Sequence, residues 1–127
     1  MKSKFSRIVV LIVLVAMLVA GCAPKATEVP STVFKVAIVM PSSITDMAFS
    51  QSMFEGLKKV QAEMAGESAM EIAYSENMFK VPDASAAIRD YASKGYNLVI
   101  AHGSHYGTSL QQVAPDFPKT AFAWGTS

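Results

Sequence analysis

Short β-rich runs alternate with segments of helical periodicity from residue 33 to residue 124, and this alternation restricts the fold more than any other feature. Residues 33–40 are almost wholly apolar or β-branched and end at Pro41, as a buried strand does. The other predicted strands are residues 69–74, 97–101 and 120–124. Strands that alternate with helices form parallel sheets with right-handed crossovers. The sequence therefore predicts an α/β fold on a parallel sheet.

Three helices are predicted between these strands. In the first, apolar residues recur at steps of three and four and mark one buried face. Its inward residues are predicted to be Phe49, Met53, Leu57, Val60 and Met64, and Gly66 ends it. The second opens at Pro82 and Asp83, ends before Gly95, and turns Ala84, Ala87, Ile88 and Tyr91 inward. The third begins between residues 104 and 108, carries Leu110 and Val113, and is stopped by Pro115 and Pro118.

Polar side chains follow the C-terminal ends of all four predicted strands. Loops at these ends open on one edge of a parallel sheet, where open α/β sheets bind ligands. The residues are Ser42, Ser43 and Asp46, then Glu76 and Asn77, then His102, Ser104 and His105, and finally Gly125 and Thr126. Surface loops are polar in most proteins, but convergent polar groups are also what a small-molecule site needs. From this set Ser43, Ser104, His105 and Gly125 are candidate ligand-binding residues.

Three residues near this edge each have two possible roles. Asp46 is placed either to cap the first helix or to bind a ligand. Phe49 is either the first core residue of that helix or an aromatic face for a planar ligand. Trp124 has the same ambiguity between the core and the wall of a pocket.

Signatures of enzymes and metal sites are weak. In residues 103–107, GSHYG, the serine stands one place too early for a G-x-S-x-G nucleophile elbow. Neither a Walker lysine motif nor G-x-G-x-x-G is present. His102 and His105 are the only histidines, and no carboxylate stands at a spacing specific for a metal. We expect no catalysis, no cofactor and no metal; an α/β hydrolase stays an alternative only if Ser104 and His105 form a nucleophile–base pair.

The first 22 residues have the pattern of a bacterial lipoprotein signal. Three basic residues precede an apolar run over residues 8–20 that is short for a membrane span, and Gly21 precedes Cys22, the only cysteine. We expect residues 1–21 to be a signal peptide, Cys22 to carry the lipid, and residues 22–32 to be a flexible tether. The predicted location is the extracytoplasmic side of a bacterial cell membrane.

Charge argues against nucleic acid as a partner. Without Lys2, Lys4 and Arg7 of the signal segment, eight basic side chains face ten acidic ones, and no basic residues cluster. Proteins that bind nucleic acid carry a basic patch that neutralises phosphates.

Residues 46–58, with the sequence DMAFSQSMFEGLK, contain an Asp, a Phe-Ser-Gln-Ser run and a Glu-Gly-Leu run directly after the first strand. Together with residues 95–101 and 114–118, they resemble the basic membrane lipoprotein family. Its members are substrate-binding lipoproteins of ABC importers, best known as purine nucleoside receptors, with two lobes of the type I periplasmic-binding-protein fold. Ser50 stands where the family commonly has Asn, and residues 102–105 differ from its usual Gly-Phe.

The resemblance implies that Asp46 hydrogen-bonds the ligand, that Phe49 stacks on a nucleobase and that Gln51 supports the site. It also implies that residues 33–127 form the first lobe, with the second lobe absent from this chain. We then expect a fragment or a truncated product that binds weakly by itself, because the two lobes close on the ligand together.

The predicted function is that of a lipid-anchored solute-binding protein of an ABC importer, with a purine nucleoside as the expected solute and an ABC permease as the partner. The alternatives are a surface sensor that binds another small molecule for signalling, an α/β hydrolytic enzyme, and a purely structural lipoprotein.

Overall fold

The computed structural model describes residues 33–125. The predicted signal peptide, the predicted lipidation site Cys22, the predicted tether over residues 22–32 and Thr126 lie outside the described residues. Across residues 33–125, each helix is too short or too polar to cross a bilayer.

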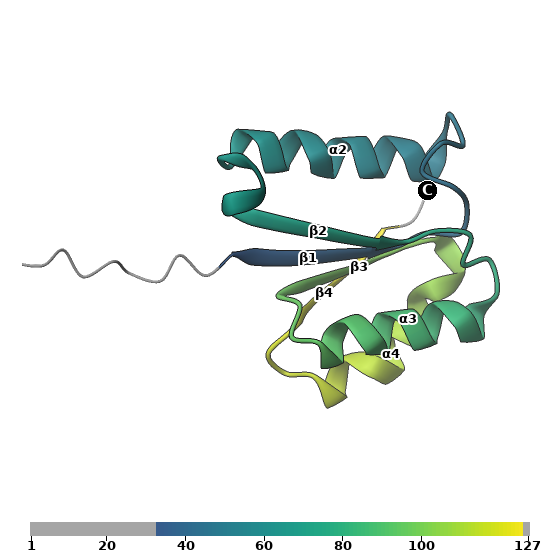
Figure 1. Ribbon diagram of the computed structural model, residues 1–127. Helices are drawn as coiled ribbons and strands as arrows, with labels where there is room; N and C mark the ends of the chain where they lie inside the picture. Colours follow the sequence, from purple (N-terminus) through teal and green to yellow (C-terminus); the bar gives the residue numbers. More distant parts are fainter. Residues whose placement is uncertain (1–32, 126–127) are drawn as a thin grey trace, which may run out of the picture. The chain divides into compact units, whose positions relative to one another are not determined.

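Four strands form a single parallel sheet (Figure 1). They are β1 (Phe34–Val39), β2 (Met70–Ser75), β3 (Leu98–His102) and β4 (Ala121–Gly125). Their order in the sheet is β2-β1-β3-β4, so β1 and β3 are the inner strands. Each observed boundary lies within one residue of its prediction, and the predicted parallel α/β fold is confirmed.

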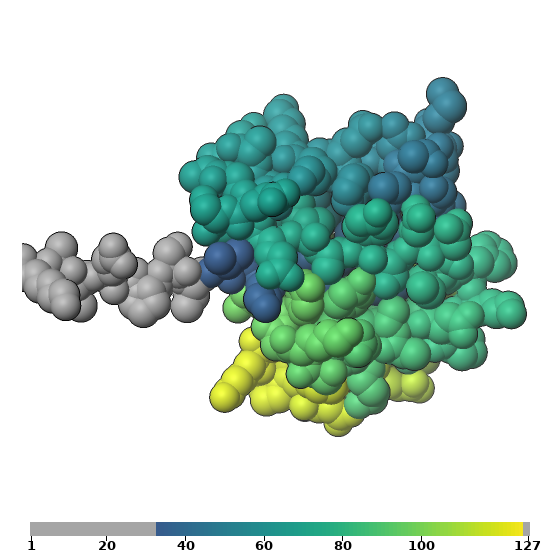
Figure 2. All heavy atoms as spheres, in the orientation of Figure 1, coloured from purple at the N-terminus to yellow at the C-terminus, as the bar shows by residue number. Residues whose placement is uncertain are grey.

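Helices cover both faces of the sheet. Figure 1 shows α2 (Phe49–Glu63) on one face and both α3 (Val81–Ser93) and α4 (Gly107–Val113) on the other. In the space-filling view, atoms of α2 lie along the top and atoms of α3 and α4 along the bottom, with the strands between them (Figure 2). Three single turns of 3-10 helix, η1 (Gly66–Ser68), η2 (Ser104–Tyr106) and η3 (Ala114–Asp116), complete the connections.

The face beneath α3 and α4 holds the main hydrophobic core. Side chains alternate across a strand, so β1 and β3 each send every second residue to this face. The buried cluster consists of Ala37, Val39, Ala84, Ile88, Val99, Ala101, Tyr106, Leu110 and Val113. Burying a side chain as large as valine or isoleucine contributes about 1.5–3 kcal/mol. The predicted inward positions Ala84 and Ile88 are confirmed.

The face beneath α2 differs from its prediction. Val60 and Met64 were expected to point inward, but they are 44% and 45% exposed. The fully buried residues of α2 are Ser50 and Gln61 instead. Gln61 donates a hydrogen bond from Nε2 to the backbone oxygen of Met70 at 2.7 Å, so a polar side chain supplies a partner for the carbonyl group of the first residue of β2. The stripe of apolar residues was wrong here because it cannot detect a buried position that is polar.

The predicted glycine stop is confirmed for α3, whereas α2 ends three residues before Gly66 and Ala65 is the first left-handed residue after it. Helix α2 ends at Glu63, two residues before Ala65 and Gly66 adopt left-handed backbone angles. Gly95 follows α3 with φ +75° and donates from its N–H to the carbonyl of Ala92. Glycine tolerates this conformation without strain, which is why it so often ends a helix.

Candidate ligand-binding site

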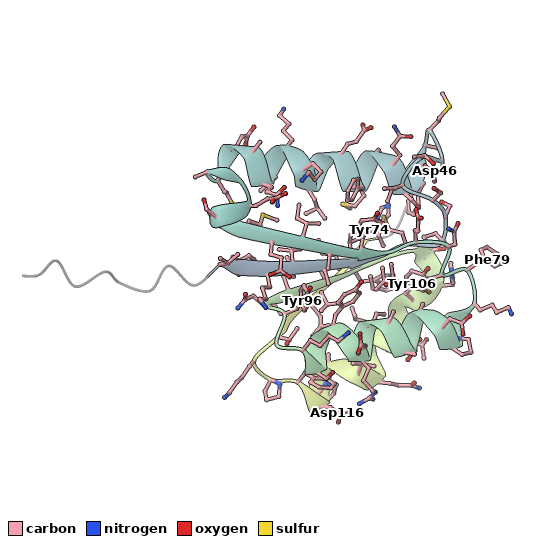
Figure 3. The ribbon with its side chains drawn as sticks, viewed as in Figure 1. Asp46, Tyr74, Phe79, Tyr96, Tyr106 and Asp116 are labelled. Atoms are coloured by element: carbon pink, nitrogen blue, oxygen red, sulfur yellow. The ribbon has the colours of Figure 1, made fainter. Side chains whose placement is uncertain are left out.

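The loop between β1 and α2 places Asp46 against the first turn of α2 (Figure 3). Its carboxylate accepts hydrogen bonds from the backbone N–H groups of Ala48, Ser50 and Gln51 at 2.9, 3.0 and 3.1 Å. It also accepts one from the hydroxyl of Ser42 at 2.5 Å. A carboxylate has about four acceptor positions, so these donors fill them. The capping role predicted for Asp46 is confirmed, and its contact with a ligand stays a prediction.

The charge of Asp46 is strongly favoured. The hydrogen bond from the Ser42 hydroxyl is the main cause that lowers the pKa of this carboxyl far below its ordinary value, and the N–H groups of α2 add to it against some desolvation. Asp46 is therefore ionised at neutral pH and complements the positive end of the helix dipole. Ser50 is fully buried, with its hydroxyl 2.7 Å from that of Ser42, so the residue that replaces the family's Asn is part of this network.

Gln51 and Ser43 also have partners within the loop. Gln51 accepts from the backbone N–H of Met47 at 2.8 Å and donates to Glu55 at 2.7 Å. The hydroxyl of Ser43 lies 2.9 Å from that of Thr45 and accepts from its backbone N–H. Both side chains thus hold the shape of the loop, which fits the supporting role expected of Gln51. Direct contact of either with a ligand stays a prediction.

Phe49 stacks on His102. The two ring centroids are 3.8 Å apart and the ring planes differ by 14°. The Nε2 of His102 lies 3.1 Å from the backbone oxygen of Phe49, within hydrogen-bond distance. His102 is only 7% exposed, whereas Phe49 is half-buried. Phe49 therefore packs against His102 and is partly exposed, and its contact with a ligand stays a prediction.

Gly125 completes this group from the neighbouring strand. A Cβ atom at Gly125 would lie 3.0 Å from Nδ1 of His102 and 3.9 Å from Cε of Met53. Residues from α2, β3 and β4 therefore meet at one point of the sheet edge. We call Phe49, His102 and Gly125 the stacking cluster. His102 was among the polar residues of the edge but not among the chosen site residues. Strand alternation could have found it, because Leu98, Ile100 and His102 share one face of β3.

Ser104 and His105 belong to a second group on the side of α3 and α4. The ring of His105 lies 4.4 Å from that of Tyr106 and 5.6 Å from that of Phe79. Tyr106 is fully buried and donates to the carbonyl of Met78 at 2.7 Å, and burial raises its pKa to about 12 (Figure 3). Sequence reasoning placed all these residues at one edge, but the structure divides them between the two faces of the sheet.

The hydrolase alternative gains no support from this second group. Ser104 is exposed. The buried Nε2 of His105 has no hydrogen-bond partner within residues 33–125. A nucleophile and its base must lie within hydrogen-bond reach of each other. In the same described range, His, Cys, Asp and Glu side chains nowhere gather in threes that could hold a metal ion.

Trp124 lies between its two predicted roles. It is 48% exposed, and its Nε1 donates to the carbonyl of Gly103 at 2.9 Å. A Cβ atom at Gly107 would come within 2.6 Å of its ring, so the indole lies directly on the backbone at the start of α4. The side chain ties β4 to the β3–α4 connection and leaves its outer surface free.

Three hollows of the surface of residues 33–125 lie apart from the stacking cluster. One of about 480 Å³ lies beside β2 and includes Phe54, Lys58 and Tyr74. Another, of about 500 Å³, lies at the N-terminal ends of β3 and β4 and includes Tyr96, Asn97 and Phe117. A smaller one of about 220 Å³ lies on the outside of the first turns of α2.

Comparison with known proteins agrees with this arrangement. The family model described as "ABC transporter substrate-binding protein PnrA-like" matches residues 33–125. A solute-binding protein of an ABC transporter system from Conexibacter woesei DSM 14684 is 26% identical, with a TM-score of 0.62 over 69% of this chain and 28% of that one. A second, from Aeropyrum pernix K1, has a TM-score of 0.59 at 16% identity over 72% of this chain and 24% of that one, and supports the fold alone.

A curated relative bears a different name. The transcriptional activator protein med of Bacillus subtilis (strain 168) is 28% identical over 113 residues, which are 89% of this chain and 34% of that protein. The chain thus spans about a third of this relative and about a quarter of the two solved structures. The family model covers most of the chain and includes the DMAFSQSMFEGLK segment on which the predicted resemblance rests. The chain belongs to the Bmp family, the PnrA-like substrate-binding proteins of ABC transporters.

Proposed function

We propose that this chain supplies one lobe of a solute-binding protein that delivers a small solute to an ABC importer. The observation that carries the proposal is the half-buried ring of Phe49, which is held against His102 at the edge where open α/β sheets bind ligands. Family membership supports transport rather than catalysis. The permease that receives the solute is the proposed partner.

A purine nucleoside is the solute that this edge suits best. Aromatic side chains stack on nucleobases with useful energy, and the stacking tolerates any base because each has a π-face. Gly125 lies beside His102, whereas Ser104 and His105 lie toward α3 and α4. Contact of Ser43, Ser104, His105 or Gly125 with the solute is part of the proposal. Asp46 acts in this proposal by holding the first turn of α2, and therefore Phe49, in place, and its direct contact with the sugar or base stays part of the proposal.

The proposed location is the extracytoplasmic face of a bacterial membrane. Cys22 would carry the lipid after removal of residues 1–21, and residues 22–32 would connect it to β1. Labelling with a radioactive fatty acid, with Cys22→Ser as the control, tests the anchor independently of any ligand.

Ligand binding is the decisive experiment. The protein encoded by the complete reading frame that contains these residues would be produced without its signal and screened by thermal shift and calorimetry with adenosine, guanosine and inosine. A rise in Tm with one of them, lost in Phe49→Ala, supports both the receptor function and the stacking role. If no nucleoside shifts the Tm but another solute does, the purine assignment is wrong and solute binding stands.

A regulatory role is the second candidate, and the similarity to a protein named as a transcriptional activator favours it. A sensor could use the same lobe to bind a small molecule without transporting it. Uptake of the radiolabelled solute by a deletion strain separates the two functions. Loss of uptake supports the importer, and unchanged uptake together with binding in vitro supports the sensor.

A further inference from the structure

We infer that His102 is a positioning residue: it fixes the plane of the Phe49 ring so that the opposite ring face meets the flat face of the solute. This inference rests on the proposed function, and it adds a residue whose role the family resemblance does not supply. Three observations carry it: the stacking geometry, the hydrogen bond to the backbone of Phe49, and the way β4 confines the imidazole.

The stacking contact is close and nearly parallel. Aromatic pairs in proteins usually have centroids about 4.5–7 Å apart in offset or edge-to-face arrangements. Phe49 and His102 are at 3.8 Å and 14°, so one ring lies almost directly over the other. At this separation, tilting the Phe49 ring out of its plane would bring its edge into collision with the imidazole. The contact therefore defines the plane of the Phe49 ring rather than merely touching it.

The hydrogen bond fixes the backbone of the same residue. The oxygen of Phe49 can only accept, so Nε2 of His102, 3.1 Å away, carries the hydrogen. A neutral imidazole then has its lone pair on Nδ1. One side chain thus holds both the ring and the carbonyl of Phe49. Because Phe49 is the first residue of α2, the entry of the helix into the sheet edge is held by the same contact.

His102 is itself confined rather than bonded into place. Its Nδ1 is buried and has no hydrogen-bond partner among the residues that the structure describes. Gly125 lies beside that nitrogen, where a Cβ atom would stand only 3.0 Å away. The imidazole is therefore enclosed between the ring of Phe49 and the backbone of β4.

A purely structural reading explains this residue poorly. Leu98 and Ile100 occupy the same face of β3 and are apolar, as packing under α2 requires. A buried polar atom without a partner destabilises a protein, so packing alone would favour an apolar residue over His102 here. An aromatic ring that also donates one hydrogen bond to Phe49 meets the needs of positioning, and a leucine would not.

Two substitutions separate the two contacts. His102→Gln retains an N–H donor for the carbonyl of Phe49 but removes the ring face. His102→Phe retains the ring face but removes the donor. Dissociation constants for the bound nucleoside would be measured by calorimetry with the protein of the complete reading frame, for both variants, for Phe49→Leu and for the double variant. Circular dichroism and the Tm would show that each variant folds.

We expect His102→Gln to raise Kd by about two- to tenfold, the worth of one aromatic pair expressed as affinity. His102→Phe should restore most of this loss, which a merely structural role of the hydrogen-bonded histidine would not predict. In the Phe49→Leu background, His102→Gln should change Kd by less than about twofold, because the ring that it positions is gone.

Equal effects of His102→Gln in both backgrounds, or the same Kd as the wild type in a folded His102→Gln, would overturn the inference and leave the proposed function intact. If the wild type binds no planar solute at all, the purine assignment of the proposed function fails and this inference fails with it. The two failures are therefore distinguishable by the wild-type measurement alone.

Discussion

The two faces of the sheet are built in different ways. Under α3 and α4, the hydrophobic core cluster is aliphatic apart from Tyr106, whose hydroxyl donates to the carbonyl of Met78, and the buried polar residue of α4 is Ser109. Under α2, the buried set includes Gln61 and His102, while Val60 and Met64 face outward. One face has the composition of an ordinary core, and the other places polar groups where an apolar residue would stabilise the fold more.

This difference separates stability from binding. The buried core cluster beneath α3 and α4 can hold the sheet together without contributing to a site, because its side chains lie on the face of the sheet opposite the stacking cluster. The α2 face carries Phe49 and His102 near the C-terminal ends of the strands. Its buried Gln61 bonds to the backbone of β2 and so fixes helix α2 relative to the sheet. Substitutions on the first face should therefore change stability alone, and substitutions on the second should also change affinity.

The largest effect on stability is expected from Ile88→Ala. This side chain is fully buried in the α3–α4 core, and removing it leaves a cavity. The expected cost is about 2–5 kcal/mol of unfolding free energy, measured by urea denaturation. Val60→Ala, at an exposed position on α2, is the matched control and should stay within about 0.5 kcal/mol. Similar costs at the two positions would contradict the proposed contrast between the faces.

Phe49→Ala should have the largest effect on binding. Loss of one base–aromatic contact corresponds to about 1–3 kcal/mol, which calorimetry would detect as a weaker Kd. The control is Phe117→Ala, which removes another half-buried phenylalanine, one that lies near the N-terminal end of β4 and away from the stacking cluster. This control should lower Tm without weakening the affinity of the folded protein. A nucleoside Kd that is unchanged in Phe49→Ala would exclude Phe49 as a stacking residue.

Gly125→Ala tests the confinement of His102 by β4. The new Cβ atom would stand 3.0 Å from Nδ1, so the imidazole must shift and with it the Phe49 ring. Overpacking of this kind costs about 1 kcal/mol or more, and affinity should fall with stability. Gly56→Ala in α2 meets no atom within 4 Å and should instead stabilise the helix by about 0.5–1 kcal/mol. Unchanged nucleoside affinity in Gly125→Ala would show that the edge tolerates movement of His102.

The last prediction concerns how the contribution of Asp46 to folding stability changes with pH, and its effect at neutral pH is the smallest of the four. Its pKa is lowered in the folded state by the Ser42 hydroxyl and the N–H groups of α2. Its stabilising contribution is therefore complete above the unfolded pKa of about 3.9 and is lost as pH falls below that value toward the folded pKa.

Urea unfolding at pH 6, 4 and 3 should accordingly show that the stability gap between the wild type and Asp46→Asn narrows on acidification. Asp116→Asn, which removes one partner of an exposed ion pair with Arg89, is the control for general effects of lost charge. A gap that stays constant from pH 6 to pH 3 would mean that the carboxylate does not stabilise the helix as a charge.

Sequence reasoning predicted the fold well because its signals are local. Strand composition, helical steps and the glycines after α2 and α3 each depend on a few neighbouring residues, and every strand was placed within one residue. Of the predicted inward residues of α2, Phe49, Met53 and Leu57 are partly buried, and Val60 and Met64 were wrong. Burial of Gln61 instead depends on its hydrogen bond to the carbonyl of Met70, which belongs to another element.

The site was harder to predict for the same reason. Asp46 could be recognised as a cap from its place before α2, but the stack of Phe49 on His102 joins residues more than fifty positions apart. Whether His102 and His105 face the same side of the sheet depends on the turn η2, which begins directly after β3 and carries His105 to the other side. Residue type alone therefore identified the edge but not the grouping of residues along it.

The position of β1 in the middle of the sheet has a consequence for how the protein folds. The first strand to be made pairs with β2 on one side and β3 on the other, and the contact between Lys35 and Asn97 joins residues 62 positions apart. Contacts of such long sequence separation slow folding, because the connecting chain loses conformational entropy before the pairing contributes any stabilising free energy. Until β3 has been made, one edge of the most apolar strand is unpaired and able to join other chains. A chaperone that covers residues 34–39 during synthesis would therefore raise the yield of folded protein more than one that acts at β4.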